Sequence, residues 1–265
     1  MTSSNTISFP ARDVFGSRFR CLLLTHQPGP VVAGLLNDLV RPHAVVEGGR
    51  DYWMPRGLLD PNESRLGEPE FLSDSNRKAI QTWWLAVSRN ANTPNWDIVS
   101  TCTIDGQPGL VLVEAKAHVA ELGSAGKSAP KSHNGWKNLE RITIAMAEAN
   151  RELNDVIPGF SLTVESHYQL CNRFAWSWKI ASMGVPVILV YLGFLNADDM
   201  AERGQTTFKS DSEWDEAVRD YGSGIVPDEA WTKKLDIDGT PFIPIIRAMD
   251  GRWPAKGRGS RQDGR

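Results

Sequence analysis

The sequence predicts an α/β protein, and three observations support this prediction. Residues 96–104 and 110–113 are apolar and rich in β-formers, and Asp105-Gly106 between them is a two-residue hairpin signal. Residues 185–194 form an unbroken apolar run, which is typical of a strand buried in a parallel sheet. Apolar residues recur at helical spacing in several segments around these strands. The length allows one substantial core, so we expect a single domain over residues 1–246.

The segments before the hairpin are predicted from their local patterns. Residues 19–24 favour a short strand, and residues 30–40 favour a helix with one apolar face. Residues 45–69 contain many Gly and Pro, so we expect irregular structure there. Residues 74–89 predict a helix, because a residue able to cap its start precedes a repeating apolar face.

The segments after the hairpin alternate between loop and helix. Residues 121–135 are rich in Gly, Ser, Ala and Lys and predict a mobile loop. Residues 136–156 are strongly helical and end at a Pro-Gly pair, and residues 168–183 predict a helix that stops at Gly184. A short amphipathic helix is expected over residues 212–221.

The composition sets limits on the compartment and on binding partners. Cys21, Cys102 and Cys171 are widely spaced and odd in number, which argues for a reducing compartment without a disulfide framework or a structural zinc site. No secretory leader and no membrane span is visible, so we expect a cytoplasmic protein. The net charge of −3 gives no overall attraction to nucleic acid, so a nucleic-acid binder would need a local basic patch.

Residues 247–265 form the most basic segment of the chain. Six Lys and Arg stand there against two Asp, and the Gly content predicts a flexible tail. Such a tail can gain affinity for a phosphate backbone by releasing counterions, or it can simply keep the protein in solution.

Asp97, Glu114 and Lys116 are brought together by the geometry of the predicted hairpin. A two-residue turn places Asp97 opposite Glu114, and a four-residue loop places Asp97 opposite Lys116. In both registers Asp97 shares a face with Glu114 and Lys116, because side chains alternate with period two. Directly opposed Cβ atoms lie about 4.5–5.5 Å apart. Two carboxylates and an ammonium are therefore expected at one end of a buried hairpin.

Two buried carboxylates side by side are unfavourable unless a cation neutralises them. Mg²⁺ suits such a pair, because it binds through one or two carboxylates and keeps several waters; Mn²⁺ is the alternative. Lys116 could then orient or deprotonate a water, or stabilise charge that develops on a phosphate. The structural alternative is a cross-strand salt bridge between Lys116 and Asp97.

The segments Pro94-Asn95-Trp96-Asp97 and Glu114-Ala115-Lys116 resemble the motif of the PD-(D/E)xK nuclease superfamily, which has the restriction-endonuclease-like fold. The match departs from the name-giving pattern because Pro94 is not adjacent to Asp97. The resemblance implies that Asp97 and Glu114 ligate the metal, with the Ala115 carbonyl as a further ligand. It also implies that Lys116 assists the attacking water.

The order of elements extends this resemblance to a little under half of the chain, over residues 74–194. The superfamily core runs helix, three-strand meander, helix and parallel fourth strand. The chain supplies most of that order, with the helix at 136–156 as an insertion, although the first strand of the meander is not visible in the sequence. The fold expected is thus a mixed sheet of restriction-endonuclease-like type, flanked by helices and carrying helical insertions.

The helix at 168–183 adds two candidates to the site. Gln169, Arg173 and Trp176 fall on one stripe at helical spacing. Several families of the superfamily carry a Gln or a basic residue on this helix, so by analogy Gln169 and Arg173 would position a phosphate or the attacking water. Arg can bind phosphate through two hydrogen bonds. The alternative is a solvated helix face.

Some further candidates are less well defined. His118 shares the strand face of Glu114, although a lone His at a strand end is more often a surface residue. Lys127 and Lys131 lie in the predicted loop and could contact a nucleic-acid backbone, or could be ordinary solvated lysines. Many such nucleases have an additional upstream carboxylate, and the sequence does not decide among the four acidic residues that could supply it. These are Glu47, Asp60, Glu63 and Glu70.

The function that the sequence favours is that of a nuclease dependent on Mg²⁺ or Mn²⁺, acting on the phosphodiester bonds of nucleic acid, with DNA favoured over RNA. Two alternatives stay open. One is a non-catalytic nucleic-acid-binding or assembly module of the same fold, and the other is an unrelated metabolic α/β enzyme in which the hairpin is only structural. The sequence leaves the oligomeric state undetermined, including whether the chain forms a homodimer.

Overall fold

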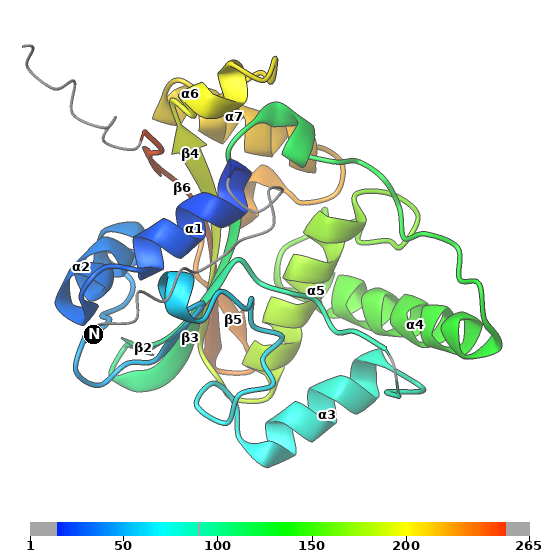
Figure 1. Ribbon diagram of the computed structural model, residues 1–265. Coiled ribbons are helices and arrows are strands. Elements are labelled where there is room, and N and C mark those ends of the chain that lie inside the picture. The colour runs from blue at the N-terminus through cyan, green and yellow to red at the C-terminus, as the bar shows by residue number, and fades with distance from the viewer. Residues whose placement is uncertain (1–14, 90, 253–265) are drawn as a thin grey trace, which may run out of the picture.

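Six strands form one mixed sheet in a computed structural model that describes residues 15–89 and 91–252 (Figure 1). The order across the sheet is β1-β2-β3-β4-β6-β5. Neighbours pair antiparallel except for β3 with β4 and β4 with β6, which are parallel. The predicted α/β class is confirmed. The strands are β1 (Trp53–Met54), β2 (Ile98–Ile104), β3 (Gln107–Lys116), β4 (Val187–Leu195), β5 (Leu235–Ile237) and β6 (Thr240–Asp250).

Helices cover both faces of this sheet, and each face has its own hydrophobic core. On one face, α1 and α2 pack against alternate strand residues such as Val111 and Val113. On the other face, α3, α4, α5 and α7 pack against Leu110 and Leu112. The helices are α1 (Gly16–Thr25), α2 (Gly29–Val40), α3 (Asp74–Trp84), α4 (His133–Val156), α5 (Tyr168–Ser182), α6 (Asp198–Ala201) and α7 (Asp211–Gly222), with short 3-10 turns η2 (Gly57–Leu59), η3 (Val119–Glu121) and η4 (Asp228–Thr232).

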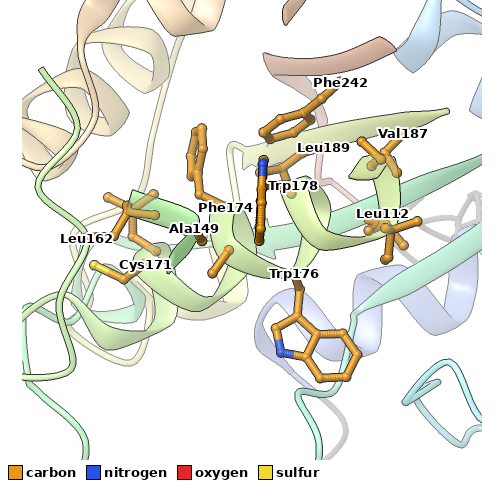
Figure 2. Close-up of a cluster of buried hydrophobic side chains, with 14 of the residues drawn as sticks. Leu112, Ala149, Leu162, Cys171, Phe174, Trp176, Trp178, Val187, Leu189 and Phe242 are labelled. Carbon is orange, nitrogen blue, oxygen red and sulfur yellow. The ribbon is translucent and has the colours of Figure 1, made fainter. Parts of the chain in front are cut away.

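Helix α5 lies at the centre of the second core. Figure 2 shows its aromatic side chains among residues of the sheet and of α4. The rings of Phe174 and Phe242 are 5.8 Å apart between centroids, and those of Trp176 and Trp84 are 5.7 Å apart. Large buried aromatic rings contribute much of the apolar area removed from water. These contacts hold α5 rigidly across the sheet, which fixes the direction of its polar side chains.

The β2–β3 hairpin adopts the tighter of the two predicted registers. Ile104 pairs with Gln107, so the turn consists of Asp105 and Gly106 alone. Their φ angles are 49° and 79°, and two successive positive values are what a type I′ turn requires. The pairing continues to Ile98 opposite Val113, which brings Asp97 to the level of Glu114.

Several predicted elements are confirmed with small changes at their ends. The helices predicted at 30–40, 136–156, 168–183 and 212–221 correspond to α2, α4, α5 and α7, and the strand predicted at 185–194 is β4. Residues 45–69 are mostly irregular but contain β1, the strand of the meander that the sequence did not reveal.

The strand predicted at 19–24 is wrong, because this segment belongs to helix α1. The buried residues of α1 include Ser17, Arg20, Cys21 and Leu24, which recur at helical spacing and form the face that packs on the sheet. The short apolar run alone does not distinguish a strand from a helix.

Helix α3 ends at Trp84 rather than at Arg89. The Asn138 side chain on α4 bonds the backbone of Val87 twice, accepting from its N–H at 2.8 Å and donating to its carbonyl at 2.9 Å. Leu85 has extended backbone angles, and the two bonds to Asn138 hold Val87 outside the helix.

The predicted boundary between domain and tail at residue 246 is also wrong. Strand β6 continues to Asp250, so residues 247–250 belong to the sheet. The Arg247 guanidinium donates to the carbonyls of Leu39 and Arg41 at 3.0 and 3.2 Å, which fixes it against the end of α2. The remaining residues of the predicted tail, 253–265, lie outside the described part of the chain.

Candidate active site

Asp97, Glu114 and Lys116 converge at the end of the β2–β3 hairpin that lies away from its turn. Glu114 and Lys116 stand near the end of β3, on the face that packs on α5. Asp97 immediately precedes β2, and its backbone N–H donates to the Val113 carbonyl at 3.2 Å. Its Oδ2 accepts from the Ala115 N–H at 2.7 Å, so the Asp97 side chain reaches across to the backbone of β3.

Glu114 is the most deeply buried charge of this site, with 1% of its surface exposed. Arg173 Nε donates to Glu114 Oε2 at 2.6 Å, and Lys116 Nζ donates to Glu114 Oε1. Burial by itself would raise the pKa of Glu114, but the two cations outweigh it and hold the pKa below its ordinary value. Glu114 is therefore an ionised carboxylate with both oxygens engaged.

Asp97 has the opposite electrostatic environment. Burial raises its pKa first, and repulsion from Glu114 raises it further, to about 8. The Lys116 charge and the Ala115 N–H act against this rise without cancelling it. Oδ1 of Asp97 accepts no hydrogen bond from any residue in the described ranges. Asp97 thus favours its protonated form near neutral pH, whereas Glu114 is ionised.

Lys116 remains a cation in this environment. Burial lowers its pKa, but Glu114 and Asp97 reverse that effect and leave the pKa above its ordinary value. Its ammonium also donates to Gln169 Oε1 at 3.0 Å. A charged ammonium can orient a water or stabilise negative charge, whereas deprotonating a water requires the neutral amine. The structural alternative, a cross-strand salt bridge between Lys116 and Asp97, does not form, because Lys116 pairs with Glu114 instead.

Both α5 candidates reach the site, but Arg173 does so as a buried counterion. Only 5% of Arg173 is exposed, which contradicts the solvated-face alternative for this residue. Besides Glu114, its guanidinium donates to Asn172 Oδ1 at 2.8 Å and to the Asn95 carbonyl at 2.6 Å. It also stacks on the Trp96 ring at 4.5 Å. All three guanidinium nitrogens therefore donate to protein partners. Arg173 has no free pair of nitrogens for the two hydrogen bonds to phosphate that the sequence predicted.

Of the four upstream acidic candidates, the structure brings Glu63 to the site. Its Oε2 accepts from Asn95 Nδ2 at 3.0 Å, and its charge contributes to the raised pKa of Asp97. The next residue, Ser64, bridges Trp96, which explains this proximity.

The other three acidic candidates lie elsewhere. Glu47 is two residues past Val45, which bridges Thr103 near the opposite end of β2. Asp60 is held in a local bridge with Arg56, and Glu70 is exposed.

Glu121 is a member of this neighbourhood that sequence reasoning missed. Its Oε1 accepts from Ser17 Oγ at 3.0 Å, which ties it to the first turn of α1, and its Oε2 accepts from the Ala117 N–H. His118 Nε2 lies 3.8 Å from Glu121 Oε1, and the His118 side chain is 13% exposed, so it is not a surface residue. The contact of Glu121 with α1 depends on the tertiary fold, and the predicted loop gave no signal of it.

The two loop lysines differ from each other. Lys131 is exposed, as an ordinary solvated lysine would be. Lys127 instead lies over the Tyr168 ring at 4.5 Å, and burial lowers its pKa. It lines a cavity of about 300 Å³ together with Gln169 and Arg173. A larger cavity of about 550 Å³ lies between the α1–α2 turn and β1 and includes no member of the carboxylate site.

The acidic side chains at the hairpin are carboxylates, a ligand type that suits Mg²⁺ better than a soft transition metal, but both oxygens of Glu114 already accept from cations. Within residues 15–89 and 91–252, no three His, Cys, Asp or Glu side chains form a metal-binding group. Two carboxylates remain, which is the usual protein contribution to a Mg²⁺ site. Burial and the nearby Glu114 charge raise the pKa of Asp97, and a divalent cation bound beside it would lower that pKa.

Comparisons of the chain with protein-family models, with curated proteins and with solved structures find no match. Among the helices in the described ranges, none has the length and apolar character that crossing a membrane requires.

Proposed function

We propose that this protein is a metal-dependent nuclease of restriction-endonuclease-like fold. It hydrolyses phosphodiester bonds in nucleic acid, and DNA is favoured over RNA as the substrate. The observation that most supports the proposal is the convergence of Asp97, Glu114 and Lys116 at one strand end, where Asp97 accepts from the Ala115 N–H and Lys116 donates to Glu114. Two carboxylates with a charged donor beside them are parts that metal-dependent phosphate chemistry requires.

The topology gives independent support. Strands β1, β2 and β3 form an antiparallel meander, helices α4 and α5 follow, and β4 then pairs parallel to β3. The strands and the helices after them follow the order that the resemblance to the PD-(D/E)xK superfamily implies, but α3, expected before the meander, lies within it, and β1 lies outside the expected core at 74–194. The chain also differs in that β1 has only two residues.

Each residue of the site has a distinct role in this proposal. Asp97 and Glu114 would hold Mg²⁺ or Mn²⁺, with the Ala115 carbonyl as a further ligand. The ion, when bound, would polarise the phosphate and lower the pKa of a coordinated water. Lys116 orients the attacking water or stabilises charge on the phosphate through its ammonium. Gln169 positions Lys116 by accepting a hydrogen bond from its Nζ at 3.0 Å. Arg173 positions Glu114 by donating from Nε to its Oε2 at 2.6 Å.

A second candidate function, that of a non-catalytic nucleic-acid-binding module, is favoured because both oxygens of Glu114 are already paired with cations. Arg173 and Lys116 engage both oxygens of Glu114 in a buried setting, as in a network that only stabilises the fold. A non-catalytic nucleic-acid-binding module of the same fold would keep this network. It would gain nothing, however, from the buried carboxylate of Asp97.

The direct test is incubation of the full chain with single- and double-stranded DNA and RNA, read on a gel. Cleavage should require Mg²⁺ or Mn²⁺ and stop in EDTA. Asp97→Asn and Lys116→Met should each reduce the rate by about 100-fold or more, the usual loss when a group that stabilises transition-state charge is removed. Lys131→Met, which changes an exposed lysine, should cleave like the wild type.

Two outcomes would contradict the nuclease proposal. Equal cleavage by the wild type, Asp97→Asn and Lys116→Met would place the chemistry outside this site. Binding of nucleic acid without cleavage under all metal conditions would favour the non-catalytic module instead.

A further inference from the structure

The 300 Å³ cavity beside the carboxylate site is lined by hydrogen-bond donors and contains no acidic side chain. It lies between the start of α5 and the irregular segment 92–95. Two cations contribute to its wall, Lys127 and Arg173, in a chain whose net charge is −3. Among the described residues that line it, no Asp or Glu is present. Because Arg173 is paired with Glu114, Lys127 is the cation of this wall whose charge is not neutralised by a carboxylate of the described residues.

The amides of Gln169 and Asn172 have their orientation fixed by their partners. Gln169 Oε1 accepts from Lys116 at 3.0 Å, and Asn172 Oδ1 accepts from Arg173 at 2.8 Å. Because Lys and Arg only donate hydrogen bonds, these amide oxygens must face them. The amide NH₂ groups of Gln169 and Asn172 donate to no residue in the described ranges, so both remain as donors for a ligand.

Lys127 lies at the cavity wall and is partly exposed to solvent. Its ammonium lies 4.5 Å from the centre of the Tyr168 ring, and no ion pair with a carboxylate forms within residues 15–89 and 91–252. Its backbone N–H donates to the Val164 carbonyl at 2.8 Å, which anchors this part of the loop. Because the Lys127 ammonium is partly exposed and has no carboxylate partner among these residues, it is available to an anionic ligand.

We propose that this cavity binds a phosphate group of the nucleic-acid substrate, adjacent to the phosphodiester bond held at Asp97 and Glu114. This inference rests on the proposed function. A phosphate has only acceptor oxygens and negative charge, which matches a wall of two amide NH₂ groups and the Lys127 ammonium. Gln169 joins the two sites, because it lines the cavity and also bonds Lys116.

The test measures binding of a fluorescein-labelled single-stranded oligonucleotide by anisotropy, in EDTA so that no hydrolysis occurs. Lys127→Met keeps the aliphatic stem but removes the charge, and should weaken binding by about 10-fold or more. The slope of log affinity against log salt should become shallower by about 0.7, the value for one phosphate contact on a single strand. Lys131→Met is the matched control from the same loop, and Lys127→Arg should restore the slope.

Strands with a 5′-phosphate or a 5′-hydroxyl identify which phosphate is bound. Equal losses for both strands would indicate an internal phosphodiester, and a loss confined to the phosphorylated strand would indicate a terminal phosphate. Both results would support the cavity as a phosphate site.

An unchanged slope and affinity in Lys127→Met, with the wild type still cleaving, would overturn the cavity proposal and leave the nuclease assignment standing. If the wild type binds no nucleic acid but binds a mononucleotide through Lys127, the assignment to a nucleic-acid strand is overturned together with the nuclease proposal.

Discussion

Asp97 and Glu114 stand at the same end of one hairpin, yet their surroundings differ in charge. Glu114 is bonded to two cations, and its pKa is held below the ordinary value. Asp97 receives one backbone N–H, and its pKa is raised to about 8. The difference originates in α5, because Arg173 reaches Glu114 on β3 but does not bond Asp97. The fold thus stabilises one carboxylate and leaves the other dependent on a proton or a cation.

Removal of Arg173 should produce the largest loss of stability, because it would leave Glu114 buried with one of its two cations missing. Arg173→Met is expected to lower the free energy of unfolding by about 3–5 kcal/mol, measured by urea denaturation. The double variant with Glu114→Gln should recover part of this loss, since no buried charge is then unpaired.

A control for this variant is Lys179→Met on the same helix. Lys179 pairs with Glu148 at 3.2 Å at a more exposed position, and its loss should cost about 1 kcal/mol or less. A similar small cost for Arg173→Met would mean that Glu114 does not depend on its counterion.

Asp97→Asn should act in the opposite direction and stabilise the metal-free protein at high pH. The pKa of Asp97 is higher in the native state than in the unfolded chain, where it is about 4. Its stabilising contribution is therefore complete below pH 4 and is lost as the pH rises toward about 8. Asn keeps an acceptor for the Ala115 N–H but does not titrate. In EDTA, the advantage of the variant should grow between pH 5 and 8, and the difference between the two pKa values sets an upper bound of about 3–4 kcal/mol on this growth.

Urea unfolding of both proteins at several pH values measures this advantage. Parallel stability curves for the two proteins would show that Asp97 does not carry the unfavourable charge.

Glu63→Gln should have the smallest effect of these variants, a modest decrease in the pKa of Asp97. Among the causes that raise the pKa of Asp97, the repulsion from Glu63 ranks behind that from Glu114. An NMR titration of ¹³C-labelled aspartate should show a lower pKa of Asp97 in Glu63→Gln, and a larger decrease in Glu114→Gln. Glu70→Gln, which changes an exposed acid, should leave the titration unchanged. Equal effects of Glu63→Gln and Glu70→Gln would remove Glu63 from the site.

The two Asp-Gly hairpins show how far the sequence predicts the fold. Asp105-Gly106 lies between two clear β-rich segments, so both the turn and its register follow from local pattern. Asp238-Gly239 forms the same kind of turn between β5 and β6 and was missed. Only three strand residues precede it, and Pro241 and Pro244 follow it, although Pro usually argues against a strand. Strand β6 persists because it pairs with its neighbours in the assembled sheet.

The candidate site divides in the same way between local and tertiary information. Side-chain alternation places Asp97, Glu114 and Lys116 together, because it depends only on the hairpin. Of the four acidic candidates, Glu63 lies at the site because Ser64 bridges Trp96. No local sequence pattern predicts this bridge. Arg173 was identified from its helical stripe, but its role as a buried counterion required the packing of α5 on β3.

The most direct test of the contrast between Asp97 and Glu114 is the thermal unfolding of the protein with and without Mg²⁺ or Mn²⁺. An ion that binds only the native state should raise the melting temperature of the wild type, by the equivalent of about 2.7 kcal/mol at 100 times its Kd. The shift should disappear in Asp97→Asn and in Glu114→Gln, and should persist in Glu70→Gln. No shift in the wild type, or an undiminished shift in Asp97→Asn, would contradict a cation site built on Asp97 and Glu114.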